Sequence, residues 1–175
     1  PWSRSSAKQG DNMALSLEVL LRKLVQADVD FVIVGGYAAV FHGSTMVTQD
    51  LHICCDFSTA NLTRLGEALR DLQPVHRMTP QRIPLEVTPT FCRGLRNLYL
   101  STSCGQIDCL SEVKGLGDFS EVSAVSQPAK LPWGTCRVLS LEALIKAKRA
   151  MGRPRDQEAV LQLESIRERV NEDDV

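Results

Sequence analysis

Three side chains in this sequence are of the types that bind metal ions or move protons. Asp50 and His52 stand two residues apart in a strand-like run, and alternate residues of a strand point to the same face of the sheet. Asp108 lies in a later apolar run, where a carboxylate needs a partner or a metal ion. The plainer interpretation is that Asp50 caps a turn and Asp108 makes a local salt bridge. The residues alone leave both interpretations open.

A pair of glycines precedes this group in the chain. Gly35 and Gly36 stand between a β-branched run at residues 31–34 and a short helical pattern at 37–42. The first N–H groups of a helix are free, and glycine lets an anion come close to the backbone. The junction therefore suits a phosphate group, although most such pairs are only tight turns. If the two strands are neighbours, the glycines lie beside Asp50 and His52.

A sheet is needed to bring these side chains together, and the apolar patterns predict one. Strand-like runs alternate with helical spacing, and a Ser-Cys-Gly turn joins two of the later runs as a hairpin. The order predicts an α/β domain with a mixed sheet flanked by helices, and two C-terminal helices. We expect strands at 31–34, 49–55, 98–102 and 106–110, with a short β-like run at 85–87, and helices at 14–27, 37–42, 58–72, 140–151 and 154–170.

Other features of the pattern set the expected boundaries. In the first helix, Leu15, Val19, Leu20 and Leu24 fall on one face at helical spacing. The region from 111 to about 134 contains Gly, Pro and Ser and is expected to be a connector. We expect residues 1–12 to be a tail or the remnant of a tag, 13–135 to be the core, and 136–170 to be a helical segment packed on it.

The composition of the 175 residues excludes some classes of function. The chain is 43% hydrophobic and 23% charged with a formal net charge of −1, so it does not bind nucleic acid through bulk positive charge. No apolar run reaches the roughly 18 residues of a membrane span, and no secretory signal precedes the first helix. The six cysteines form no C-x-x-C pair, which is typical of buried free thiols in a reducing compartment. We therefore expect a cytoplasmic protein without a membrane partner.

Several motifs in the same order resemble the minimal nucleotidyltransferases, a family of the polymerase-beta-like superfamily with antitoxin and abortive-infection members. The resemblance spans roughly residues 15 to 165. It starts with the Gly-Gly turn and a Thr-x-Asp-hydrophobic pattern, continues in a hairpin that ends Gly-x-hydrophobic-Asp-x-Leu, and closes with Ser-Leu-x-x-Leu-x-x-x-Lys and Gly-Arg-x-x-Asp. The matched positions are Gly35, Gly36, Thr48, Asp50, Gly105, Asp108, Leu110, Ser140, Leu141, Leu144, Lys148, Gly152, Arg153 and Asp156.

The resemblance implies a metal-dependent transfer of a nucleoside monophosphate from a nucleoside triphosphate, ATP being the expected one, to an acceptor hydroxyl. In the family, three acids hold two Mg²⁺ ions, with Mn²⁺ as an alternative. By this resemblance Asp50 is the first metal ligand, and Asp108 is the third acid, near the acceptor oxygen, where it eases deprotonation. The residues expected to contact the nucleotide are Gly35, Gly36, Ser44, Thr45, Lys148 and Arg153. Lys148 and Arg153 equally suit ion pairs with nearby acids.

His52 departs from the pattern, which has a second aspartate at this position. An imidazole suits Zn²⁺, Mn²⁺ or Fe²⁺ better than Mg²⁺, and it brings no negative charge for a second ion. Three interpretations follow: an active enzyme with a shifted metal preference, nucleotide binding without turnover, or an inactivating substitution introduced into the chain. Ala159, where the family often has an acid, is a minor departure.

Two classes of function remain after this step. The first is an enzyme whose acceptor is a protein, an RNA or a small molecule, with tRNA modification as a variant of the same class. The second is a catalytically degenerate module that binds a nucleotide or a partner protein, as in a toxin–antitoxin pair. His52 is the residue that distinguishes them. Both require that Asp108 lies on the same side of the sheet as Asp50.

Overall fold

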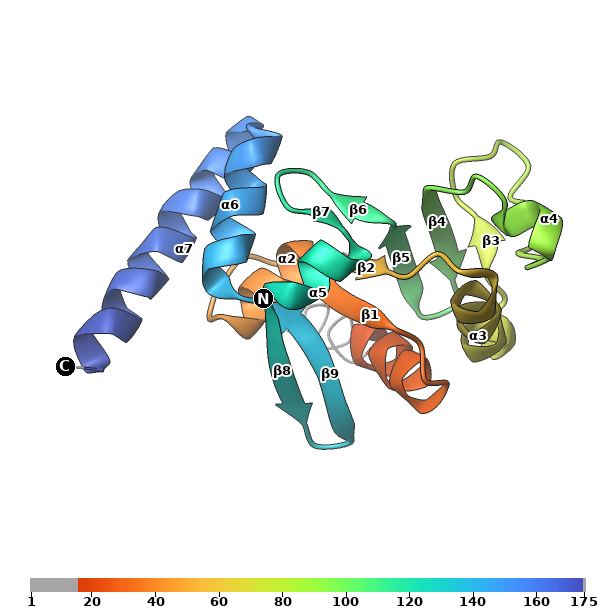
Figure 1. The fold of residues 1–175 in the computed structure, drawn as a ribbon, viewed down its shortest axis with the longest axis horizontal. Coiled ribbons are helices and arrows are strands. Elements are labelled where there is room, and N and C mark those ends of the chain that lie inside the picture. The colour runs from red at the N-terminus through yellow and green to blue at the C-terminus, as the bar shows by residue number, and fades with distance from the viewer. Residues whose placement is uncertain (1–15, 175) are drawn as a thin grey trace, which may run out of the picture.

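The computed structural model describes residues 16–174, which form one seven-stranded mixed sheet with helices packed around it (Figure 1). The strand order is β3-β4-β5-β2-β1-β9-β8. This confirms the predicted α/β class with a mixed sheet. The strands are β1 (Phe31–Val34), β2 (Asp50–Cys55), β3 (Val75–His76), β4 (Asn97–Thr102), β5 (Gly105–Leu110), β8 (Ser126–Leu131) and β9 (Gly134–Leu139).

Helices connect and cover these strands, and a small two-stranded sheet lies beside them. The helix pair α6–α7 stands at one end of the molecule, and α3 and α4 stand at the other (Figure 1). The helical segments are an N-terminal helix at residues 16–26, α2 (Gly35–Phe41), α3 (Thr59–Leu69), the 3₁₀ turn η1 (Arg70–Leu72), α4 (Pro89–Cys92), α5 (Phe119–Ala124), α6 (Leu141–Met151) and α7 (Pro154–Asp173). The small sheet pairs β6 (Glu112–Val113) with β7 (Gly117–Asp118).

The centre of the sheet is held by a fixed register between β1, β2 and β5. β1 runs antiparallel to β2 and pairs Val34 with His52. β2 runs parallel to β5 and pairs His52 with Asp108. The apolar centre of each strand is buried: Val32, Ile53 and Ile107 are each 0% exposed, as expected for apolar runs covered on both faces. The register places the chemistry-bearing residues of both strands side by side.

The N-terminal helix buries a different face from the one we predicted. Leu17, Leu20, Leu21 and Leu24 are at most 1% exposed, whereas Val19 is 39% exposed. The prediction was therefore right for Leu20 and Leu24 and wrong for Val19, and Leu15 lies outside the described residues. The four leucines form a continuous apolar stripe at helical spacing, and a face that includes Val19 would bury fewer of them. The helix therefore turns the leucine stripe toward the sheet.

The middle of the chain differs from the prediction in two places. Residues 85–87 form no strand; instead Leu85 N–H donates to Pro74 O at 2.9 Å, and Val75 makes a single bridge to Pro84. The expected connector from 111 to 134 is structured, because it contains β6, β7, α5 and β8. The strand β9 that follows was missed altogether, although it pairs in parallel with β1 at the centre of the sheet.

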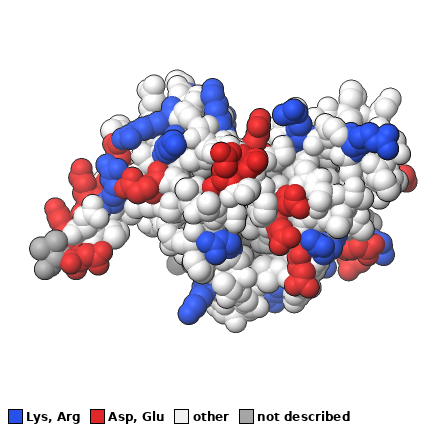
Figure 2. Space-filling view, in the orientation of Figure 1, with Lys and Arg blue, Asp and Glu red and all other residues white. Residues whose placement is uncertain are grey.

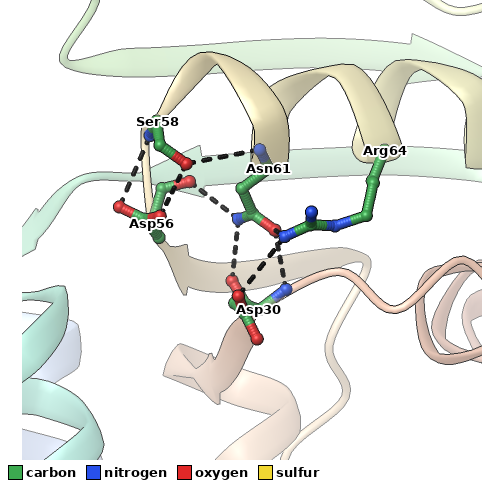
Figure 3. A network of polar contacts seen from close by, with 5 residues as sticks. All are labelled: Asp30, Asp56, Ser58, Asn61 and Arg64. Atoms are coloured by element: carbon green, nitrogen blue, oxygen red, sulfur yellow. Dashed lines mark hydrogen bonds and ion pairs between the residues drawn. The ribbon is translucent and has the colours of Figure 1, made fainter.

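A buried asparagine ties the far ends of β1 and β2 together (Figure 3). Asn61 of α3 is 0% exposed and accepts from Asp30 N–H at 2.8 Å. Its amide donates to the backbone oxygens of Asp30 at 3.0 Å and Asp56 at 2.7 Å. Ser58 caps α3 by accepting from Asn61 N–H. The network fixes where β1 begins and β2 ends.

The cysteines lie mostly in this core, and none forms a disulfide within the described part of the chain. Burial raises the pKa of the Cys54 thiol to about 12, with smaller contributions from the charges of Cys55 and Asp118. Such thiols behave as small apolar side chains rather than as nucleophiles. Within residues 16–174, no helix has the length and apolar character needed to cross a bilayer.

Candidate active site

The three chemistry-bearing side chains converge on one face of the sheet, as the sequence predicted. Asp50, His52 and Asp108 each place a ligand atom within 4.8 Å of the others. His52 Nε2 lies 3.3 Å from Asp108 Oδ2, which follows from their direct pairing across β2 and β5. Asp50 and His52 are partly exposed and Asp108 is buried, so the cluster opens to solvent on the β2 side.

The glycine pair lies directly against this cluster. Gly35 follows β1 with a φ of +65°, a conformation that strains residues with a Cβ. A Cβ atom at Gly35 would lie 3.0 Å from His52 Nδ1, because Val34 pairs with His52. The N-terminus of α2 has no side-chain cap, so its first N–H groups have no such partner. The predicted junction of glycine turn and ligand cluster is therefore present.

Gly36 makes room for Thr48, a matched position of the resemblance to which no role at the site was predicted. A Cβ at Gly36 would come within 2.8 Å of Thr48 Oγ1, which donates to Asp50 O at 3.1 Å. The Thr-x-Asp spacing was the available signal, since a threonine two residues before a strand aspartate can fix its backbone. Thr48 thus joins the glycine turn to the first acid.

Two cavities adjoin His52. One has a volume of about 350 Å³ and a polar lining that includes Gly36, Thr48, Asp50, Lys148 and Arg153. The other has a volume of about 450 Å³ and a more apolar lining that includes Tyr99, Leu110, Val113, Leu144 and Met151. His52, Lys148 and Arg153 line both, so the basic residues predicted at the site do face it. A hollow of this size accommodates a small ligand.

Lys148 and Arg153 also hold a buried carboxylate. Asp156 is 1% exposed and forms two ion pairs. Its Oδ1 lies 3.4 Å from Lys148 Nζ, and its Oδ2 lies 2.6 Å from Arg153 Nε. Burial would raise the pKa of Asp156, but the hydrogen bonds and charges of Arg153 and Lys148 outweigh it and lower the pKa. The two cations are thus fixed at the rim of the cavities by their pairing with Asp156. Basic side chains gather over α6 and the adjoining end of α7 in Figure 2.

Ser44 and Thr45 are held away from the cluster. The Ser44 hydroxyl donates to Gln162 Oε1 at 2.6 Å, and Gln162 Nε2 donates to Thr45 Oγ1 at 2.9 Å. Neither residue lines the two cavities beside His52. Their hydroxyls anchor the loop before β2 to α7 in this structure.

Comparison with solved structures places this arrangement in a known fold. A Thermotoga maritima protein described as a "putative nucleotidyltransferase" superposes with a TM-score of 0.52 at 18% identity, covering 87% of this chain and 91% of its own. The chain has a nucleotidyltransferase-like fold. Two Helicobacter pylori chains, one with the same description, score 0.44 and 0.42 at 14% identity, and this chain spans just over half their length. No protein-family model and no curated protein sequence matches.

The nucleotidyltransferase-like fold of this chain holds an arginine at the site that sequence reasoning missed. Arg77 Nη2 pairs with Asp108 Oδ1, and Arg77 Nη1 donates to Gln106 Oε1 at 2.9 Å. Burial alone would raise the pKa of Asp108, but hydrogen bonds and charges from His52 and Arg77 outweigh it and lower the pKa. Arg77 stands 31 residues before Asp108, and no motif marks it, so only the fold could reveal the pair.

Proposed function

We propose that the chain is a metal-dependent nucleotidyltransferase that transfers a nucleoside monophosphate from a triphosphate, such as ATP, to an acceptor hydroxyl. One observation carries the proposal: Asp50, His52 and Asp108 meet within 4.8 Å beside the glycine turn. The nucleotidyltransferase-like fold supports the same conclusion independently. The acceptor is a protein, an RNA or a small molecule.

The donor set fits a divalent ion. Two carboxylates and one imidazole on a solvent-accessible face are ligands that Mn²⁺ accepts readily, while Mg²⁺ prefers oxygen ligands alone. When bound, such an ion polarises phosphate oxygens and stabilises the charge that develops on them during transfer. We expect Asp50 to be the principal ligand, because its side chain makes no ion pair with another described residue, whereas Asp108 makes two.

The chain's own residues supply the rest of the site. The N–H groups at the start of α2, which no side chain caps, lie next to Gly35 and Gly36 and suit phosphate oxygens of the triphosphate. Lys148 and Arg153 add positive charge at the same cavity rim. Ser44 and Thr45 can contribute only if their hydrogen bonds with Gln162 are released.

In the proposed step the acceptor oxygen attacks the α-phosphorus. A bond forms between these two atoms, and the bond from the α-phosphorus to its bridging oxygen breaks. Pyrophosphate leaves with that electron pair. The resemblance assigns Asp108 to the acceptor proton, but a carboxylate whose pKa is held low by Arg77 and His52 is a weak base. We therefore assign the proton to solvent, and Asp108 to charge stabilisation.

The experiment that tests this function is a transfer assay with α-labelled nucleoside triphosphates and Mg²⁺ or Mn²⁺. We expect Mn²⁺-stimulated incorporation or pyrophosphate release that falls roughly 100-fold in Asp50→Asn, because that change removes a ligand from the metal. The matched control is Asp71→Asn, an exposed acid outside the cluster. Equal activity in Asp50→Asn and the wild type would reject the site.

A second candidate function is favoured by the contacts of Asp108. Its Oδ1 pairs with the Arg77 guanidinium, and its Oδ2 faces His52 Nε2. These partners satisfy the carboxylate without a metal ion. The chain would then bind a nucleotide, or a partner protein as in a toxin–antitoxin pair, without turnover. A thermal-shift panel of nucleotides separates the two, since a ligand of the folded state raises the melting temperature. Stabilisation by a triphosphate without metal or transfer would favour the binding module.

A further inference from the structure

The edge strand β3 and its neighbour β4 position Arg77 beside the site. Arg77 follows β3, and its N–H donates to Tyr99 O at 3.0 Å, where Tyr99 in β4 is the direct partner of Asp108 in β5. Its guanidinium lies 5.7 Å from the centre of the Tyr99 ring and binds the Gln106 side chain. Backbone, ring and amide together fix the cation on Asp108.

Burying the Arg77 side chain at this position costs stability, and its packing contacts alone do not explain why an arginine is present. Arg77 Nε is buried and has no hydrogen-bond partner among the described residues, and such an orphaned N–H destabilises the fold. A smaller or apolar side chain would avoid that cost. The arginine contributes something else at this point, namely a fixed positive charge directly on a carboxylate of the candidate metal centre.

The charges of the site point the same way. Asp50 and Asp108 bring two negative charges, Arg77 brings one positive charge, and His52 brings no negative charge where the family pattern has an acid. The sum over these four side chains alone is one negative charge, with histidine counted as neutral, and Lys148 and Arg153 at the cavity rim add no negative charge. Two divalent ions on so little negative charge would repel each other with little compensation, whereas one ion is readily held.

We propose that Arg77 takes the place of a second divalent ion at Asp108, so that the centre binds a single ion. The proposal rests on the proposed function, because it concerns the metal centre of the same site. Asp50 faces the single ion, and Arg77 stabilises the negative charge of Asp108 that a second ion would otherwise neutralise. Arg77 is thus a positioning residue that determines metal stoichiometry.

The test is a Mn²⁺ titration followed by electron paramagnetic resonance, which needs no turnover. We expect one ion per chain in the wild type and in Arg77→Lys, which keeps the charge. In Arg77→Met the ion should bind at least about tenfold more tightly, because the competing cation is gone. The double variant His52→Asp with Arg77→Met restores an acid and removes the cation, and it should bind two ions. Thermal unfolding of each variant confirms that it is folded.

The outcomes separate this inference from the proposed function. Two ions in the wild type would overturn the role of Arg77 while leaving a metal-dependent enzyme in place, and this measurement needs no variant. Equal affinity and stoichiometry in folded Arg77→Met and Arg77→Lys would also overturn it, because a merely structural arginine would give that result. No Mn²⁺ bound by any form, the double variant included, would instead reject the metal centre itself.

Discussion

At the scale of single residues, His52 decides what the site can do. It stands on β2 between the glycine turn and Asp108, with Nδ1 toward Gly35 and Nε2 toward Asp108. We expect His52→Asp to raise metal-dependent nucleotide binding or transfer by about tenfold or more, because it adds a hard, negatively charged ligand. The assay is isothermal titration of Mg²⁺ and Mn²⁺ with a non-hydrolysable triphosphate. Weaker binding than in the wild type would show that the imidazole is itself the preferred ligand.

Gly35 supports a second prediction at this scale. Gly35→Ala should cost about 1 to 2 kcal/mol of unfolding free energy, because its φ of +65° strains a residue with a Cβ. It should also weaken Mn²⁺ binding. The new methyl carbon would lie only 3.0 Å from His52 Nδ1 and would push the imidazole out of position. Urea unfolding and Mn²⁺ titration measure the two effects.

The chain offers a matched control for Gly35→Ala. Gly43 also has positive φ, at +106°, but a Cβ there would meet nothing within 4 Å. Gly43→Ala should therefore lose stability and keep its metal affinity. If both variants lose metal affinity equally, the contact between Gly35 and His52 has no part in forming the site.

The sequence predicted part of the site and not the rest. Asp50, His52 and Asp108 could be placed because strand periodicity and order along the chain determine which side chains share a face. Arg77 could not, because its contact with Asp108 depends on the two-residue strand β3 folding back onto β4. Likewise nothing local indicated that Gln162, in the last helix, would engage Ser44 and Thr45.

At the scale of elements, Asn61 of α3 determines where β1 and β2 start and stop. We expect Asn61→Ala to lower the unfolding free energy by about 2 to 4 kcal/mol, because the buried Asn61 side chain loses its three hydrogen bonds to Asp30 N–H, Asp30 O and Asp56 O. Of these three groups, Asp30 O keeps its bond from Asp56 N–H. Chemical denaturation measures the loss. Thr63→Ala, on an exposed position of the same helix, is the control and should change stability little. A similar loss in both would assign the effect to the helix rather than to the asparagine.

The same scale shows why the predicted elements were incomplete. β9 has the alternating pattern of a strand: Thr135 and Arg137 are exposed, and Cys136 and Val138, which alternate with them, are buried. The signal was obscured because Gly, Pro and Ser around it are typical of loops. β8 contains Pro128 and forms the edge of the sheet, the position where a strand tolerates proline. The longer helices were correct because their periodic patterns extend over several turns.

At the scale of the whole molecule, the pairing of Asp156 with Lys148 and Arg153 fastens α7 to α6 at the cavity rim. The pKa of Asp156 is lowered in the folded state, so its contribution to stability is fully present above the ordinary pKa of about 3.9. That contribution is lost as the pH falls through the lowered folded pKa. The protein should therefore lose this stabilisation only in strongly acidic solution.

Replacing Asp156 isolates that contribution. Asp156→Asn should lower the unfolding free energy at pH 7 by about 2 to 4 kcal/mol, because two cations lose a buried partner. The difference from the wild type should start to shrink below about pH 4, where the unfolded chain takes up the proton, and should vanish only below the lowered pKa of the native carboxyl. Denaturation curves from pH 7 to pH 2 measure this, with Glu158→Gln, an exposed acid of the same helix, as the control. A difference that stays constant across this range would mean that the carboxylate's charge does not hold α7 in place, and that the loss at pH 7 comes from altered packing alone.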